Sequence, residues 1–184
     1  MDTTTPTRTR RLLAAALAGA AALGVGLVGV GITAAAAAPA TGTPTCSTAE
    51  LSVRVLSGSP GAGQRYGTLV LTNAGHRTCA VEGFGGMALL GAPRQGVPTD
   101  LRRLSDQPVR SVVLSPGGSA RSALHWTAIP AVDENAMTCE PVAPTVAVTP
   151  PDQTSALLVG WGLGAVCQHG LIWQEPYVPG SAAF

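Results

Sequence analysis

The residues with the clearest chemistry in this 184-residue chain are its four cysteines, Cys46, Cys79, Cys139 and Cys167. An even number of cysteines predicts two disulfides if the domain is exported to an oxidising compartment. Three pairings are possible, and the sequence alone does not choose among them. We favour Cys46–Cys79 with Cys139–Cys167, which staples each half of the chain locally. Metal binding would need reduced thiols, and no Cys-x-x-Cys or His-x-x-x-His spacing is present. We therefore predict neither a metal nor a cofactor, although Cys167 and His169 come closest to a ligand pair.

Three histidines, His76, His125 and His169, are the candidates for acid–base chemistry. A Ser-His-Asp hydrolase needs one histidine to meet a carboxylate and a hydroxyl in space, which a sequence neither shows nor excludes. The chain has no Gly-x-Ser-x-Gly elbow, and it has no lysine, which excludes Ser-Lys chemistry. We therefore predict no catalytic residue.

Four acidic residues could form functional carboxylate pairs: Glu82, Asp100, Asp133 and Glu134. Two of them could serve glycoside hydrolysis, and Asp133 with Glu134 could contribute to a calcium site. A calcium ion needs six or more oxygens, and a small sandwich usually lacks a deep cleft. Solvated acids are therefore the interpretation that we prefer.

Aromatic residues are few, and three of them indicate a ligand surface. Trp126 is expected in the core. Trp161, which lies between two glycines, Trp173 and Tyr177 are less easily buried. Exposed aromatic rings on a rigid sheet could stack on sugars or anchor a protein partner. The alternative is that these three rings cap the ends of the fold.

The first 40 residues have the pattern of a signal peptide. Arg8, Arg10 and Arg11 precede an uncharged run over 12–38, and residues 38–40 read Ala-Pro-Ala, a small-x-small cleavage motif. The run is long enough to span a bilayer, so an uncleaved anchor is the alternative, with membrane contact through this segment only. The remaining 144 residues suit one domain, and their net charge of −1 argues against nucleic acid as a partner.

Beyond a short leader at 41–45, the pattern predicts one β domain over 46–178 and a tail at 179–184. Short alternating segments separated by Gly/Pro turns favour an antiparallel β-sandwich, and no segment has helical periodicity.

In the strand at 120–126, Ala120, Ser122, Leu124 and Trp126 share the inward face. Glycines at 83, 85 and 86 predict a bulge or a close backbone approach. The strands are expected at 51–55, 66–72, 79–82, 87–90, 109–114, 120–126, 145–149 and 155–159, with a final hairpin between 165–167 and 171–173. The stretches 91–108 and 127–141 are expected to be irregular.

Several segments together resemble a known family. They are Cys46, the segment 66–90 with Leu-Thr-Asn, Cys79 and Gly-Phe-Gly-Gly, the hairpin at 112–126, the stretch 145–152 and Cys167. Over 46–178 the chain is similar to the exported actinobacterial domain of unknown function 4232. Many relatives have Gly-Tyr-Pro-Gly where this chain has residues 83–86. The resemblance implies an exported, disulfide-bonded, immunoglobulin-like β-sandwich stapled by two disulfides, and it implies no activity.

These features together predict a non-enzymatic binding or structural module that is secreted or held in the cell envelope. Its partner would be a cell-wall glycan or an envelope or extracellular protein. A small secreted hydrolase and an inhibitor of a secreted protease acting through the stretch 91–108 are the alternatives. The fold does not decide among them, because sandwiches carry many functions.

Overall fold

The computed structural model describes residues 42–104, 106–134 and 139–183. The predicted signal peptide at 1–40 lies outside the described residues. Within the ranges described, no helix has the length and hydropathy of a membrane span. The chain divides after Pro39, and the unit Ala40–Phe184 contains every described element. This unit has a core of its own and is therefore expected to fold without the preceding segment.

The described elements are strands and one short 3-10 turn, so the predicted all-β class is confirmed. They are η1 (Thr48–Glu50), β1 (Leu51–Ser57), β2 (Gln64–Asn73), β3 (Cys79–Glu82), β4 (Gly86–Leu90), β5 (Asp100–Arg103), β6 (Ser111–Leu114), β7 (Ser119–Thr127), β8 (Thr145–Thr149), β9 (Leu157–Gly160), β10 (Leu171–Gln174) and β11 (Val178–Pro179). The strands run in short lengths between Gly- and Pro-rich turns, as the sequence pattern predicts.

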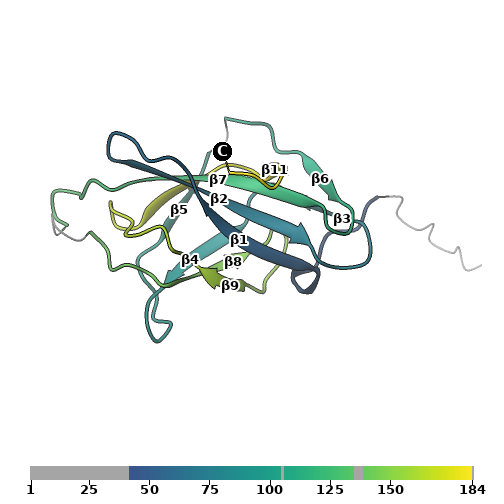
Figure 1. Cartoon of the computed structure of the whole chain (residues 1–184), viewed down its shortest axis with the longest axis horizontal. Coiled ribbons are helices and arrows are strands. Elements are labelled where there is room, and N and C mark those ends of the chain that lie inside the picture. The colour runs from purple at the N-terminus through teal and green to yellow at the C-terminus, as the bar shows by residue number, and fades with distance from the viewer. Residues whose placement is uncertain (1–41, 105, 135–138, 184) are drawn as a thin grey trace, which may run out of the picture. The chain divides into compact units, whose positions relative to one another are not determined.

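The largest sheet has six strands in the order β1-β2-β7-β10-β5, with β11 also pairing β7. Its longest ladder joins β2 and β7 from Gln64 opposite Thr127 to Thr72 opposite Ser119, and these two strands lie side by side in Figure 1. A three-stranded sheet, β4-β8-β9, lies below β1 in that view, and β3 pairs with β6. The pairs are antiparallel except β10 with β5, which is parallel. The immunoglobulin-like topology stays a prediction.

Three details of the predicted strand pattern are wrong. No strand is expected at Val178–Pro179, but β11 pairs with β7 there, so the predicted tail at 179–184 begins inside a strand. Residues 165–167 form no strand, because Gln168, His169 and Gly170 all have positive φ and direct β10 toward β7 and β5 instead of back onto 165–167. The stretch 91–108 also contains β5, whose polar residues give no alternating hydrophobic signal. A strand at the edge of a sheet is commonly charged in this way, since charge discourages pairing with other chains.

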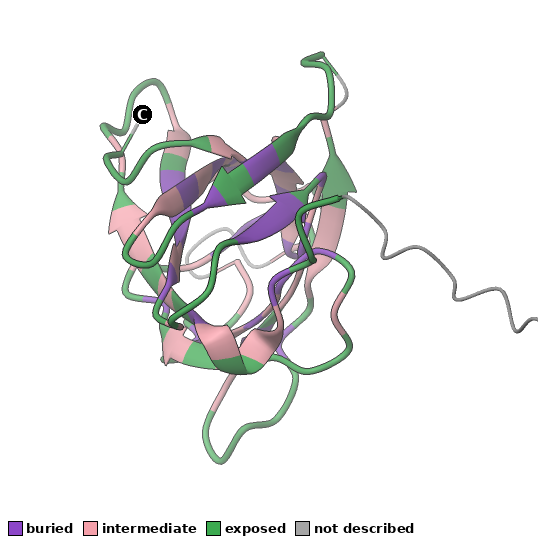
Figure 2. Ribbon diagram, turned by 90° about the vertical axis from the view of Figure 1, so that its right-hand side faces the viewer, coloured by how far each residue is buried: buried purple, intermediate pink, exposed green. Residues whose placement is uncertain are grey.

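The core lies between the six-stranded sheet and the three-stranded sheet. Along β7, buried and half-buried residues alternate, and the predicted inward set of Ala120, Ser122, Leu124 and Trp126 is at most 1% exposed. Figure 2 shows such alternation as bands of buried residues between intermediate or exposed ones along the strands. Side chains from β2 and β7 meet those from β4 and β8 in one cluster, and removal of this apolar surface from water stabilises the fold.

The glycine-rich bend after β3 brings two backbone segments close together, as predicted. A Cβ on Gly85 would lie 2.6 Å from the carbonyl oxygen of Thr149 and 3.5 Å from the ring of Tyr177. Only glycine therefore allows the approach of the chain to the end of β8 at this point.

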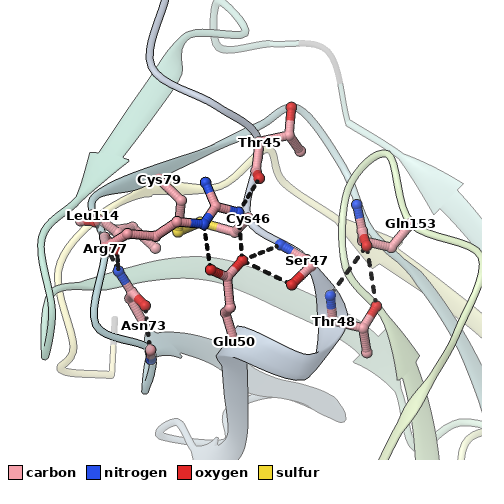
Figure 3. Close-up of a disulfide and its surroundings, with 11 residues drawn as sticks. Thr45, Cys46, Ser47, Thr48, Glu50, Asn73, Arg77, Cys79, Leu114 and Gln153 are labelled. Carbon is pink, nitrogen blue, oxygen red and sulfur yellow. Dashed lines mark hydrogen bonds and ion pairs between the residues drawn. A yellow bond between two sulfur atoms is a disulfide. The ribbon is translucent and has the colours of Figure 1, made fainter.

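The two disulfides are Cys46–Cys79 and Cys139–Cys167, the pairing that we favoured. Cys46 lies in the segment before β1, and its backbone N–H donates to Ala80 in β3 at 2.9 Å. The N–H of Ala80 donates back to Pro44 at 2.9 Å. The first disulfide thus holds the start of the domain against β3 (Figure 3).

Polar contacts surround this disulfide in Figure 3. The Glu50 carboxylate accepts hydrogen bonds from the Arg77 guanidinium and from the backbone N–H and hydroxyl of Ser47. The Arg77 hydrogen bonds, followed by those from Ser47, lower the pKa of Glu50 to about 2. The buried Asn73 amide donates to the carbonyls of Arg77 and Leu114. These contacts bind the end of β2 to the segment before β1 and are structural in character.

Candidate functional site

A line of four side chains crosses the face of the six-stranded sheet that points away from the core. Strand register places Tyr66 of β2 opposite His125 of β7, and His125 opposite Trp173 of β10. Trp173 in turn lies opposite Arg102 of β5. Directly opposed residues of paired strands point to the same face, so these side chains form a line across four strands. We call Tyr66, His125 and Trp173 the aromatic row.

The aromatic row is accessible to solvent because its neighbours in sequence face the core. Leu124 and Trp126, on either side of His125, are 1% exposed, and Ile172 beside Trp173 is fully buried. Alternation along the strands therefore directs His125 and Trp173 outward, where both are half-buried. Tyr66 is 44% exposed. Aromatic surface thus faces solvent from paired strands and not from a loop.

Hydrogen bonding orients the imidazole at the centre of the row. The rings of Tyr66 and His125 are stacked, with centroids 4.9 Å apart and planes 16° apart. His125 Nε2 lies 2.6 Å from Gln64 Oε1. An amide oxygen only accepts hydrogen bonds, so Nε2 carries the proton and donates. In the neutral ring, Nδ1 is then an acceptor that a ligand hydroxyl can use.

A cavity of about 380 Å³ adjoins the row at the end of β7. Its volume is within the range of small-molecule sites. Polar groups on its wall include the side chains of Gln64, Thr127 and Gln168, and the Gln168 amide is held by a 3.0 Å hydrogen bond to the Ile129 carbonyl. The lining residues are Gln64, His125, Trp126, Thr127, Ile129, Gln168, Leu171 and Trp173.

A second cavity, of about 330 Å³, lies on the other side of Tyr66. Tyr66 and Arg65 line it together with the loop after β1 and the segment containing Leu163. Trp126 contributes to the walls of both cavities. At the opposite end of the row, Arg102 forms a two-pronged ion pair with Asp100, with Nε–Oδ1 and Nη2–Oδ2 distances of 2.8 Å. The aromatic row is therefore bordered by both cavities and, at the end next to β5, by the Arg102–Asp100 ion pair.

Three aromatic residues are predicted to form a ligand surface, and one of them, Trp173, lines the first cavity. The prediction is wrong for Trp161 and Tyr177, because each is only 1% exposed. The Trp161 ring packs against Trp126, with centroids 5.2 Å apart, and its Nε1 donates to Gly164 at 2.8 Å. The local turn thus satisfies the indole N–H and lets the ring enter the core.

Tyr177 is drawn inward by the bend after β3. Its backbone N–H donates to Gly83 at 2.8 Å, and its ring lies over Gly85. Burial raises the pKa of its hydroxyl. Neither Trp161 nor Tyr177 can therefore stack on a ligand at the surface.

Sequence reasoning missed Tyr66, His125 and Gln64 as parts of this site. A signal was present, because the alternation that places Leu69 and Leu71 on one face of β2 places Tyr66 on the other. Which residues of β7 and β10 share that face at the same level depends on strand register. Register between strands distant in sequence is not readable from alternation alone.

The three histidines are placed in different surroundings. His76 is exposed in the turn after β2, His125 bonds to Gln64, and His169 Nε2 lies 3.2 Å from Asp133 Oδ1. Within the described residues, none of them has a hydrogen bond to a serine or threonine hydroxyl.

Of the four acidic candidates, Asp133 and Glu134 come together beside His169. Glu82 lies on β3, and Asp100 on β5 pairs with Arg102. The preferred interpretation, solvated acids, fits Asp133, whose side chain is 75% exposed. It is wrong for Glu134, whose side chain is 4% exposed beside His169.

Comparison with known proteins identifies a family. A family described as "Domain of unknown function (DUF4232)" matches residues 46–172. No curated protein and no solved structure matches this chain.

Proposed function

The chain belongs to the family of the domain of unknown function DUF4232, whose description assigns no activity, and we propose that it is a non-enzymatic binding module whose ligand surface is the aromatic row. The proposed ligand is a glycan of the cell wall. The observation that carries this proposal is the alignment of Tyr66, His125 and Trp173 across three paired strands, with solvent-facing rings.

The chemistry of the row suits a sugar. The apolar faces of sugar rings pack against aromatic rings, while their hydroxyls need donors and acceptors close by. Gln64, Thr127 and Gln168 in the adjoining cavity supply amide and hydroxyl groups, and His125 Nδ1 supplies an acceptor. Tyr66 and His125 are mounted on a ladder of nine residue pairs between β2 and β7, and Trp173 lies on β10, which pairs with both β7 and β5. Little backbone conformational entropy would therefore be lost on binding.

An extracytoplasmic location is part of the proposal. Two disulfides in one domain favour an oxidising compartment, and the N-terminal segment has the pattern of an export signal. A cell-wall glycan is a ligand available in that compartment. Hydrolase and protease-inhibitor functions stay predictions from the sequence.

The test is binding of residues 40–184 to purified cell-wall glycan, by co-sedimentation with insoluble wall and by fluorescence titration with soluble fragments. Trp173→Ala and Tyr66→Ala should each weaken binding about tenfold, the equivalent of about 1.4 kcal/mol for one lost stacking ring. Leu158→Ala is the matched control, because Leu158 is 47% exposed on β9, away from the row.

Equal weakening by the β9 control would place the contact elsewhere and contradict the proposal. So would glycan binding that is unchanged in Trp173→Ala, or absent in the wild-type protein up to about 1 mM, the weak end of specific affinity. Release of reducing sugar from the glycan, abolished by a histidine substitution, would instead establish the hydrolase alternative.

A further inference from the structure

Four side chains with metal-binding chemistry meet where two loops are joined by the second disulfide. Asp133 and Glu134 lie after β7, Glu140 follows Cys139, and His169 lies two residues beyond Cys167. The disulfide holds the two loops with a Cα–Cα distance of 4.8 Å between its cysteines. One donor atom each from Glu134, Glu140 and His169 lies within 4.8 Å of the other two. We call these three residues the loop cluster.

Glu134 is held rigidly by backbone groups. Its side chain is only 4% exposed, and its carboxylate accepts the N–H groups of Ala131 at 2.6 Å, Gln168 at 2.8 Å and His169. Three N–H donors thus orient the carboxylate: Oε2 accepts two of them, and Oε1 accepts one and keeps a lone pair for a further partner.

The imidazole of His169 presents its two nitrogens to different partners. Nε2 lies 3.2 Å from Asp133 Oδ1, so this nitrogen is the donor to Asp133. In the neutral ring Nδ1 then carries a lone pair, and it faces Glu134 Oε1 at 3.8 Å and Glu140 Oε1 at 3.9 Å. His169 Nδ1 and the two carboxylate oxygens thus face one another across a small space, where a proton on Nδ1 or a bound cation would compensate the negative charge.

The spacing suits one small divalent ion. Ligand atoms about 2.0–2.1 Å from a tetrahedral zinc lie roughly 3.4 Å from one another. The 3.8 Å and 3.9 Å distances from His169 Nδ1 to the two carboxylates are close to this value. Because the three ligand atoms lie within 4.8 Å of one another, the two carboxylates would have to move closer together on binding. The second nitrogen of a metal-bound histidine usually donates to a carboxylate, and Asp133 has this position. Calcium would want six or more oxygens, whereas one imidazole with two carboxylates favours zinc.

We propose that Glu134, Glu140 and His169 form a zinc-type cation site, with Asp133 as the partner of the outer imidazole nitrogen. Three protein ligands leave a fourth position for water. The site adjoins the cavity beside the aromatic row, because Gln168 both lines that cavity and donates its N–H to Glu134. A bound ion would thus order one wall of the cavity, but the site does not depend on what the row binds.

The test is zinc titration of metal-free residues 40–184 by calorimetry and by competition with a chromogenic chelator, after a thiol assay has verified that both disulfides are intact. We expect one equivalent of zinc to bind at micromolar or lower concentration and to raise the melting temperature, since a ligand of the folded state stabilises it. His169→Asn and Glu140→Gln should each weaken binding at least tenfold, and Asp133→Asn should weaken it less.

Asparagine is chosen at position 169 because it tolerates the positive φ of 57° there. Glu134 is left unchanged, since its carboxylate also holds the loop together. His76→Ala and Glu82→Gln are matched controls at exposed positions outside the loop cluster and should bind zinc like the wild type. The proposal is overturned if no zinc binds below about 100 µM, if zinc binding survives His169→Asn, or if calcium binds in preference to zinc.

Discussion

Removal of each disulfide in turn should show that the two bonds contribute unequally to the free energy of unfolding. The cysteines are 33 residues apart in Cys46–Cys79 and 28 apart in Cys139–Cys167. In the chain-entropy model, either bond then stabilises the fold by about 3.5–4 kcal/mol, and the loop lengths alone separate them by only ~0.1 kcal/mol. A large difference between the two variants must therefore come from packing.

Packing makes the loss of stability larger when the first disulfide is removed than when the second is. Cys46 and Cys79 are both 0% exposed. In the second pair, Cys167 is buried but Cys139 is half-buried. Replacing a buried sulfur by hydrogen leaves a small cavity that costs about 1 kcal/mol. We expect Cys46→Ala/Cys79→Ala to lose about 5–6 kcal/mol and Cys139→Ala/Cys167→Ala about 4–5 kcal/mol in the free energy of unfolding.

The assay is urea denaturation of residues 40–184 and of both double variants without reductant, followed by fluorescence and circular dichroism to test two-state behaviour. Sulfate can be added to all three proteins if the first variant is unfolded in plain buffer, because it strengthens apolar burial. A loss that is as large or larger for the Cys139 pair would refute the packing argument. A loss below about 1 kcal/mol for either variant would refute the loop-entropy argument.

Three further predictions concern single residues. Gly170→Ala should lower the free energy of unfolding by at least about 2 kcal/mol in a urea titration. The reason is that φ is +78° and the added Cβ would lie 2.0 Å from the carbonyl oxygen of Pro98. A stability within about 0.5 kcal/mol of wild type would contradict that contact. Asn73→Ala should cost about 2–4 kcal/mol in the same assay, since it leaves two backbone carbonyls without their buried donor. Because the folded-state pKa of Glu50 is about 2 against an ordinary 4.5, its stabilisation is complete above the ordinary value and is lost as pH falls toward 2. Urea midpoints between pH 5 and pH 2 should fall less steeply in Arg77→Gln, and an unchanged slope would show that the Arg77 hydrogen bonds do not lower this pKa.

The strand positions were largely predictable, because alternation is a local property. The sequence pattern alone predicts β3 and β8 at their observed bounds, 79–82 and 145–149, and it predicts the inward face of β7. It misses β5, since a polar strand held by the edge of a sheet has no hydrophobic period. The parallel pairing of β10 with β5 is likewise absent from any local signal, because it joins segments about 70 residues apart.

What the sequence by itself determined is the chemistry available: four cysteines for two disulfides, alternating strands, a lightly charged surface, and few aromatic residues and histidines. Which of these groups can act was decided by tertiary structure. Trp161 and Trp173 are the same residue type, yet one packs on Trp126 and the other lines a cavity. The aromatic row exists because register aligns β2, β7 and β10, and the loop cluster exists because a disulfide and a left-handed turn bring His169 to Glu134 and Glu140. Both depend on contacts between segments far apart along the chain, and local residue preferences carry no information about such contacts.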